Sequence, residues 1–499
     1  MNPIHWFQFA DDAAVITGQE KENQILLNRF TVWCQWAHMI IRVDKCSTFG
    51  IRKQITKSIQ YLPKLFINSR LVPRVELGKS FRYLGRYFDF NMSDEDHKSE
   101  VYDTLTNILN EIDNLPLHPK NKILLYSRYV LSKISWHFTV SDIGKTWVNE
   151  KLDNIASTYI RKWLELPISA TLSNVLLPRN KCGLNIILPS TKFLQCQTVS
   201  RKALKTSPNE ATNYLWKDTS NYKNVQYDSY KNTKDVLTTI RKQHEEKLQQ
   251  NMISQGSFFS NIIKHSTLSF NSIWSSVQSK LPKNIFNFTI RYINNTLPTR
   301  KNLLKWGISS TSECSFCLEP ESLLHVVAGC KTYLNQGRFT WRHDSVLNFI
   351  ASTLKSVDHS NLYADLPGYV SPSVLTGDEL RPDLLITLGN KCIYVLELTI
   401  GFESNLLTNV TRKRQKYQDL INEQHKSYEK VKFINLSISS LGVFSHSSLD
   451  FIEMLNDLKF DEQCRKYCVR KIINICIRST YYIFCKRNQE WNNPQLMSY

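Results

Sequence analysis

Three cysteines and one histidine lie close together in the C-terminal half and constrain the fold more than any other feature. They follow the spacing C-x2-C-x7-H-x4-C at Cys314, Cys317, His325 and Cys330. Three thiolates and one imidazole satisfy the tetrahedral coordination that structural zinc prefers, and four protein ligands leave no position for a catalytic water. A segment this small buries little apolar surface, so zinc would supply much of its folding free energy. Three free thiols beside a chance histidine are the alternative, but the tight spacing favours zinc.

The length and charge of the chain limit its class. It has 499 residues, which predicts several domains, and 42% hydrophobic residues, which is typical of globular proteins. Its net charge of +19, from 63 basic and 44 acidic residues, favours a polyanionic partner, although a basic surface could also serve solubility. The start of the chain lacks an apolar signal core, and no apolar run is long enough to span a membrane. With twelve irregularly spaced cysteines, this argues for a reducing compartment.

Two adjacent carboxylates stand between short apolar runs near the N-terminus. The run FQFADDAAVI at 7–16 suits two buried strands with Asp11 and Asp12 at the turn. Adjacent carboxylates held in this way can bind magnesium. Two such ions could activate a primer hydroxyl and stabilise a leaving pyrophosphate. An ordinary Asp-Asp turn between strands is the alternative.

Two further motifs follow that hairpin. The run FTVWCQWA at 30–37 precedes VDKC at 43–46, and the pair predicts a helix leading into a strand with a lysine near its start. The run FRYLGRYF at 81–88 predicts an aromatic hairpin with a glycine turn. In this order, the three motifs resemble the reverse transcriptase palm of non-LTR retrotransposons. The resemblance implies that Asp11 and Asp12 are metal ligands and that Lys45 lies near the incoming nucleotide. It also implies that Tyr83, Leu84 and Gly85 belong to a primer grip.

The same resemblance implies parts that would precede Met1. A two-metal polymerase needs a further aspartate from an earlier palm strand and a fingers domain that holds the template. We therefore expect that this chain does not polymerise DNA by itself, whether it is a fragment or a truncated copy. Product in a primer-extension assay would contradict that expectation.

Helices are expected over 95–170, where apolar residues recur at helical spacing. The segments 115–119, 163–167 and 182–184 resemble the thumb of the same reverse transcriptases, which more usually have Gly-Gly-Leu where this chain has Cys-Gly-Leu. An unrelated helical bundle is the alternative. Farther on, the run 297–307 resembles the segment that precedes the zinc knuckle of site-specific non-LTR elements. Its Arg300 and Lys301 could contact a nucleic-acid backbone, or could simply form a solvated helix end.

A second pair of acids lies beyond the cysteine cluster. Asp383 begins one predicted strand, and Glu397 lies in the next. If the connecting loop is 389–391, residue 388 pairs with 392 and Asp383 falls opposite Glu397, where both side chains would point to one face. A two-residue loop would put them on opposite faces. A plain β-meander with edge charges is the alternative.

A basic helix follows these strands. Lys413 and Tyr417 are four residues apart and share a face. PD-(D/E)xK nucleases use two acids and a lysine for catalysis. In such a site, Asp383 and Glu397 would hold magnesium, and the metal would activate a water. Lys413 would orient that water or stabilise the charge on the phosphate. The usual lysine position, two residues after the second acid, holds Thr399. Alternatives that remain open are Glu403 as a metal ligand, Lys416 in the lysine role, and a merely solvated basic face.

That displaced lysine resembles the restriction-like endonuclease of the same retrotransposon class. The runs RPD, ELT and RKRQKY, and WRHDSVL at 341–347, match its pattern. The resemblance implies that Arg342 and His343 support the site or contact the phosphate.

Together these features predict an α+β multidomain chain. The expected segments are a partial reverse transcriptase palm at 1–92, a helical thumb at 93–204, a linker or loosely packed helical spacer at 205–280, a basic segment with a CCHC zinc knuckle at 281–335, an α/β PD-(D/E)xK-like nuclease at 336–450 and a helical tail at 451–499.

The resemblance implies a reverse transcriptase and endonuclease acting in target-primed insertion in the nucleus, with Mg²⁺ and Zn²⁺ as cofactors and with an RNA template and chromosomal DNA as partners. The nuclease would nick the DNA, and the freed 3′ hydroxyl would prime copying of the RNA. Two other functions remain open: a decayed or co-opted copy that only binds nucleic acid, and a stand-alone nuclease on an inert scaffold.

Overall fold

The computed structural model describes residues 6–220, 226–389 and 391–497. The chain forms two compact units, each assembled from separate stretches. The first comprises the residues up to Asn114 with Arg128–Ala156 and Pro189–Thr233, and the second comprises Leu115–Ser127, Ser157–Leu188 and the residues from Lys234 onward. The segment predicted as one helical thumb, 93–204, is therefore divided between the units. Within the described ranges, no helix combines the length and apolar character needed to cross a bilayer.

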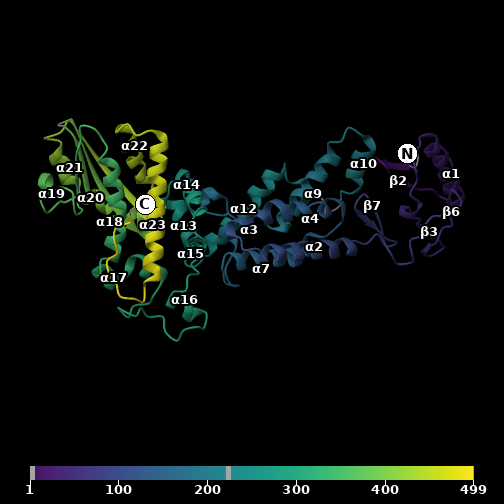
Figure 1. Cartoon of the computed structure of the whole chain (residues 1–499), viewed down its shortest axis with the longest axis horizontal. Coiled ribbons are helices and arrows are strands. Elements are labelled where there is room, and N and C mark those ends of the chain that lie inside the picture. Colours follow the sequence, from purple (N-terminus) through teal and green to yellow (C-terminus); the bar gives the residue numbers. More distant parts are fainter. Residues whose placement is uncertain (1–5, 221–225, 390, 498–499) are drawn as a thin grey trace. The chain divides into compact units, whose positions relative to one another are not determined.

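The N-terminal part of the first unit consists of two-stranded hairpins around one long helix (Figure 1). The elements are β1 (Trp6–Phe9), β2 (Asp12–Val15), α1 (Glu20–Trp36), β3 (Gly50–Lys53), β4 (Ser58–Tyr61), β5 (Phe66–Ile67), β6 (Arg70–Leu71), β7 (Phe81–Tyr83) and β8 (Arg86–Phe88). Phe9 pairs with Asp12, so Asp11 lies in the turn as predicted, whereas Asp12 begins β2. The two strands are exposed or half-buried, so the prediction of buried strands is wrong.

The prediction of a strand with Lys45 near its start is wrong. Val43–Lys45 forms a 3₁₀ turn, and β3 begins only at Gly50. The turn is closed locally, because Lys45 N–H donates to the Arg42 carbonyl at 2.9 Å and the Arg42 guanidinium binds the Asp44 carboxylate at 2.6 Å. The Lys45 N–H, which a strand would offer to a neighbour, is thus satisfied within the turn.

Helices form the rest of the first unit. In α2 (Glu95–Asn114), Val101, Leu105, Leu109 and Ile112 recur on one face and are buried, as expected for an amphipathic helix. The elements that follow are α3 (Pro119–Leu125), a π-helical turn (Tyr126–Val130), α4 (Leu131–Ile134), α5 (His137–Val140), α6 (Lys145–Trp147), a second π-helical turn (Val148–Asp153), α7 (Asn154–Trp163), α8 (Ser173–Leu176), a 3₁₀ turn (Arg179–Lys181), α9 (Pro189–Lys205) and α10 (Glu210–Asp218). Of these, α3, α8, the 3₁₀ turn and most of α7 belong to the second unit.

The region predicted as a linker or loosely packed helical spacer is helical in the structure. Trp274 is fully buried, and its indole donates to the Leu441 carbonyl at 2.8 Å, so the end of this region is well packed. The helices that begin in this region after α10 are α12 (Thr233–Gln250), α13 (Ser257–His265) and α14 (Leu268–Gln278).

Further helices follow along the chain. They are α15 (Lys283–Ile293), α16 (Arg300–Lys305), α17 (Lys331–Asn335), α18 (Arg338–Leu354), α19 (Ser373–Thr376), α22 (Leu449–Asp457) and α23 (Glu462–Cys485). Of the tail predicted to be helical over 451–499, α22 and α23 form the part up to Cys485, and the described residues after it form no helix.

A four-stranded sheet lies at the centre of the C-terminal half, in the order β12-β11-β10-β9. Its strands are β9 (Asn361–Ala364), β10 (Leu384–Leu388), β11 (Cys392–Gly401) and β12 (Lys430–Ser439). β11 and β12 run parallel, which requires a crossover; α20 (Leu406–Lys416) and α21 (Gln418–Gln424) provide it and lie beside the sheet in Figure 1. Leu385, Ile393 and Val395 pack against Tyr417 and Leu420 in one buried cluster.

The hairpin β10–β11 has the predicted register. Leu388 pairs with Cys392, and Leu384 pairs with Leu396. Asn390, part of the predicted loop, lies outside the described residues. Continued by one residue, this register sets Asp383 opposite Glu397, on the face that Leu385 and Val395 share.

Candidate functional site

The four residues of the cysteine cluster meet at one point. Their ligand atoms all lie within 4.8 Å of one another. The Cys317 sulfur is 3.3 Å from His325 Nε2 and 3.8 Å from the Cys330 sulfur. A zinc–sulfur bond of about 2.3 Å puts two sulfurs of a tetrahedron about 3.8 Å apart. The donor set and its spacing therefore fit zinc.

Local backbone geometry builds this cluster. Leu318 has a φ of 60° and donates its N–H to the Cys314 carbonyl, which turns the chain sharply after Cys317. His325 begins a π-helical turn, and its carbonyl accepts from Cys330 N–H at 2.8 Å. Burial lowers the pKa of His325 and so favours the neutral imidazole that a metal requires. A Glu319 carboxylate oxygen lies 3.8 Å from His325 Nδ1, on the opposite side of the ring from Cys317.

Arg300 supports the same loop. Its guanidinium donates to the Glu313 carbonyl at 3.1 Å and to the Ser315 hydroxyl at 2.6 Å, on either side of Cys314. Lys301 is exposed. The predicted nucleic-acid contacts of Arg300 and Lys301 stay predictions, but Arg300 also has a structural role that the sequence pattern did not indicate.

The acids Asp383 and Glu397 adjoin at the end of the sheet. Asp383 N–H donates to Glu397 Oε2 at 3.3 Å, and Leu398 N–H donates to Asp383 Oδ2 at 2.7 Å. Burial, followed by the Asp383 charge, raises the pKa of Glu397. Burial acts in the same direction on Asp383, but His343, the Leu398 N–H and Lys413 together outweigh it and lower the pKa of Asp383.

Lys413 joins this pair from α20, because its ammonium contacts Glu397 Oε1. Thr399 lies two residues after Glu397, and its hydroxyl is buried without a hydrogen-bond partner among the described atoms. The alternative lysine, Lys416, instead donates to the Tyr417 hydroxyl at 3.2 Å. The geometry therefore favours Lys413 over Lys416 as the lysine of this site.

His343 completes the cluster from α18. Its Nε2 lies 3.4 Å from Asp383 Oδ2, and its Nδ1 lies 3.0 Å from Asp344 Oδ1. Burial alone would lower the pKa of His343, but the Asp383 and Asp344 carboxylates outweigh it and raise the pKa to about 10. The imidazole is therefore cationic at neutral pH.

Arg342, the neighbour of His343, points into the interior. It is fully buried, and its Nη1 donates to the Thr480 hydroxyl at 3.2 Å. A guanidinium enclosed in this way does not reach a phosphate on the surface. The predicted phosphate contact at Arg342 is therefore corrected to a structural role in the packing of α18 against α23.

Glu403, the alternative metal ligand, is buried beyond the end of β11. The Tyr292 hydroxyl lies 3.2 and 3.0 Å from its two carboxylate oxygens. Burial raises the pKa of Glu403 to about 7. Because this carboxylate is engaged in the interior, the geometry favours Glu397 as the partner of Asp383.

In the first unit, the two N-terminal motifs come together. The Tyr83 hydroxyl donates to the Phe7 carbonyl at 3.4 Å and so links the β7–β8 hairpin to the hairpin that carries Asp11 and Asp12. Both aspartates are exposed, as is Lys45. Leu84 and Gly85 form the turn with φ values of 48° and 80°. A Cβ at position 85 would lie 2.6 Å from Trp136 Nε1, so the close approach of Trp136 requires glycine.

A second cluster of possible metal ligands, His97, Glu100 and His137, was not predicted. Tyr87 N–H donates to His97 Nε2 at 3.0 Å, so the ring proton of His97 is on Nδ1. That proton faces His137 Nδ1 at 3.2 Å. A hydrogen-bonded imidazole pair therefore accounts for the geometry without a metal. The two histidines are separated widely in the sequence, and no motif could have paired them.

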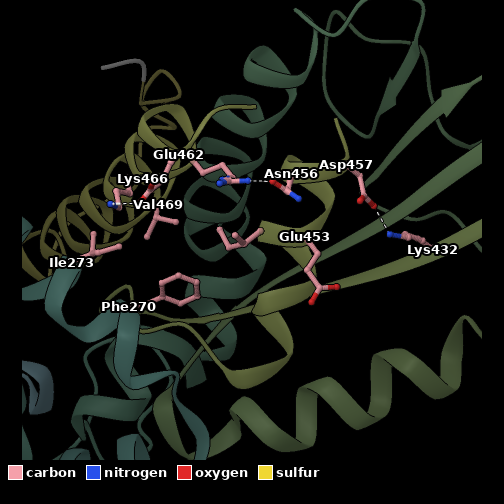
Figure 2. Close-up of a pocket in the computed structure, with 11 residues that line it drawn as sticks. Phe270, Ile273, Lys432, Glu453, Asn456, Asp457, Glu462, Lys466 and Val469 are labelled. Carbon is pink, nitrogen blue, oxygen red and sulfur yellow. Dashed lines mark hydrogen bonds and ion pairs between the residues drawn. The ribbon is translucent and has the colours of Figure 1, made fainter. Parts of the chain in front are cut away.

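A cavity of about 700 Å³ opens between α14, β12, α22 and α23 (Figure 2). Its base is apolar, with Phe270 and Val469, and its charged rim is largely paired internally. Lys432 contacts Asp457, and Lys466 contacts Glu462. None of the residues predicted for the metal sites lines it.

The chain is similar to known retrotransposon proteins. Residues 253–336, which include the whole cysteine cluster, match a family described as zinc-binding in reverse transcriptase. The chain is 21% identical over 456 residues to the retrovirus-related Pol polyprotein from type-2 retrotransposable element R2DM of Drosophila melanogaster. It is 22% identical over 414 residues to the corresponding polyprotein from type-1 retrotransposable element R2 of Bradysia coprophila.

These alignments cover 88% and 76% of this chain but 41% and 43% of the two relatives. The chain therefore spans about two fifths of the length of the curated relatives it matches. The zinc-binding segment and these relationships together support a retrotransposon polyprotein with reverse transcriptase features.

Proposed function

We propose that the C-terminal half of this chain is a magnesium-dependent DNA endonuclease that acts in target-primed reverse transcription. The observation that carries the proposal is the meeting of Asp383, Glu397 and Lys413, which come from a loop, a strand and a helix. Two adjoining carboxylates are hard oxygen donors of the kind that Mg²⁺ prefers. A cationic side chain lies beside each carboxylate: His343 beside Asp383, and Lys413 beside Glu397.

Asp383 and Glu397 are the residues that would hold the metal. A bound divalent cation would lower the pKa of a water for attack on phosphorus. Lys413, held beside Glu397, orients that water or stabilises the charge on the phosphate. His343 orients Asp383 and adds positive charge where the DNA backbone would approach. Exposed basic residues of α20, including Arg412 and Arg414, would contact the phosphates on either side of the cleaved bond.

The N-terminal hairpins are proposed to belong to a reverse transcriptase palm. In support, the relatives are named as retrotransposon Pol polyproteins, and Tyr83 contacts the hairpin of Asp11 and Asp12. In this role, Asp11 and Asp12 bind metal, Lys45 lies near the incoming nucleotide, and Tyr83, Leu84 and Gly85 hold the primer. The partners would be an RNA template and chromosomal DNA, and the place of action the nucleus.

A nicking assay tests the nuclease. Supercoiled plasmid is incubated with the zinc-loaded chain and Mg²⁺, and the wild type is compared with Asp383→Ala. Conversion to open circles by the wild type alone supports the proposal. Equal residual activity of the two proteins, with retained DNA binding in a gel-shift assay, would leave non-catalytic nucleic-acid binding as the better account.

A further inference from the structure

Tyr417 follows the last residue of α20 and is fully buried beneath the acidic pair. Its ring packs on Phe433 of β12, with centroids 5.7 Å apart, and belongs to the apolar cluster of Leu385 and Val395. A phenylalanine could fill this space equally well. The hydroxyl therefore calls for a separate explanation, because burying a polar group is unfavourable unless it is hydrogen-bonded.

That hydroxyl joins two elements of the proposed nuclease site. It donates to the Arg381 carbonyl at 2.9 Å and accepts from Lys416 Nζ at 3.2 Å. Arg381 is two residues before Asp383, whereas Tyr417 is one helical turn after Lys413. Burial, followed by the facing Glu397 carboxylate, raises the pKa of Tyr417, so the phenol keeps the proton that it donates.

The other polar contacts of the segment Arg381–Asp383 go to elements other than α20, among them the ion pair of Arg381 with Asp365 at 2.8 Å. Pro382 has no N–H to donate. Asp383 N–H donates to Glu397 Oε2, and the Asp383 carbonyl accepts from Asp365 N–H at 2.9 Å. The bond from Tyr417 to Arg381 thus ties this segment to the end of the helix that carries Lys413, beside the apolar packing of Leu380 on the same cluster.

We propose that Tyr417 is a positioning residue of the nuclease: its hydroxyl holds the Arg381–Asp383 segment against the end of α20, so that Asp383 and Glu397 can bind one divalent cation beside Lys413. The inference rests on the proposed function. Outer residues that orient metal ligands typically change metal affinity or activity by about 10- to 100-fold when they are lost.

The test compares Tyr417→Phe with a matched control, Tyr394→Phe. Tyr394 lies on β11, is also buried, and donates its hydroxyl to the Asp457 carboxylate at 3.2 Å, away from the acidic pair. Mn²⁺ binding to the zinc-loaded chain is measured by calorimetry, and nicking is measured as a function of Mg²⁺ concentration. Tyr417→Phe should weaken Mn²⁺ binding and raise the Mg²⁺ concentration for half-maximal nicking, each by about 10-fold or more. DNA affinity without metal and the thermal melting temperature should match those of the control.

Each result separates the two ideas. If the wild type binds Mn²⁺ and nicks DNA, and Tyr417→Phe does both equally well, the proposed role of Tyr417 is overturned but the proposed nuclease is not. The same holds if Tyr417→Phe and Tyr394→Phe lose activity equally. Absence of Mn²⁺ binding and nicking from the wild type would overturn the nuclease and the inference with it.

Discussion

The ammonium of Lys413 on α20 contacts the carboxylate of Glu397 on β11, and the carboxylate side chain is only 2% exposed. Removing one partner of such a pair generally costs more than the pair contributes, because the other charge stays buried and unpaired. The carboxylate can instead take up a proton, and a protonated Glu397 is a poor metal ligand. Lys413 therefore affects both the charge of the site and its affinity for metal.

Lys413→Ala is expected to lower the maximal rate of plasmid nicking by about 100-fold or more, a typical loss for one preorganised electrostatic contact. It should also shift the pH dependence of nicking to higher pH, because the pKa of Glu397, already raised by burial and Asp383, loses the cation that opposes the rise. The measurement is the nicking rate at saturating Mg²⁺ across a pH series.

Arg412→Ala is the matched control on the same helix. Arg412 is exposed, so its loss should weaken DNA binding and reduce the salt dependence of that binding, with the maximal nicking rate unchanged. If both variants weaken only DNA binding, Lys413 acts as a phosphate contact and not within the metal site.

Zinc removal is expected to unfold the knuckle locally. Cys314→Ser should lose most of the bound zinc, measured by elemental analysis, and residues around 300–336 should become accessible to limited proteolysis. Cys485→Ser, at an exposed cysteine of α23, should retain both the metal and the protection. Full zinc content and full protection in Cys314→Ser would contradict the assignment of Cys314 as a ligand.

Local patterns predicted more of this molecule than long-range contacts did. The spacing of the cysteine cluster was informative because its four ligands lie close together in the sequence, and the loop length before Cys392 decided the register that aligns Asp383 with Glu397. The sequence did not separate the two roles expected for Arg342, because adjacent helical residues point in different directions and the apolar pattern of α18 did not reveal which one faces the interior. The His97–His137 pair was missed because only tertiary packing of α2 and α5 brings the two rings together.

Glu403 is expected to make the second unit less stable as pH rises. Its pKa is raised from 4.5 to about 7 in the folded chain, so the folded state holds a proton that the unfolded state releases between these values. Stability is fully present below the lower value and falls, by at most about 3 kcal/mol, as pH rises through the higher one.

The check is urea unfolding of wild type and Glu403→Gln over this pH range. A glutamine is always neutral and can still meet the Tyr292 hydroxyl, so the variant should become progressively more stable than the wild type as pH rises. Glu453→Gln, at an exposed glutamate, is the control. Parallel curves for all three proteins would mean that Glu403 is ionised at little cost in the folded chain.

Arg338 is expected to hold the C-terminal tail to α18. Its guanidinium is fully buried and donates to the Lys486 and Gln489 carbonyls, both at 2.8 Å, while the Tyr333 ring lies 4.0 Å from it. Arg338→Met keeps most of the side-chain volume but removes two hydrogen bonds from a charged donor, which should lower the free energy of unfolding by about 3 kcal/mol.

Arg338→Lys should restore little of this stability, because one ammonium cannot reproduce the planar fork of a guanidinium. Limited trypsin digestion then reports on the tail, since cleavage after Lys486 and Arg487 requires that it leave α18. Both variants should be cut there faster than wild type, whereas Arg465→Met, at a partner of Asn456, should not. Equal cutting rates in all the proteins would show that the remaining contacts of the tail, such as the bond from Trp341 Nε1 to the Gln495 carbonyl, hold it without Arg338.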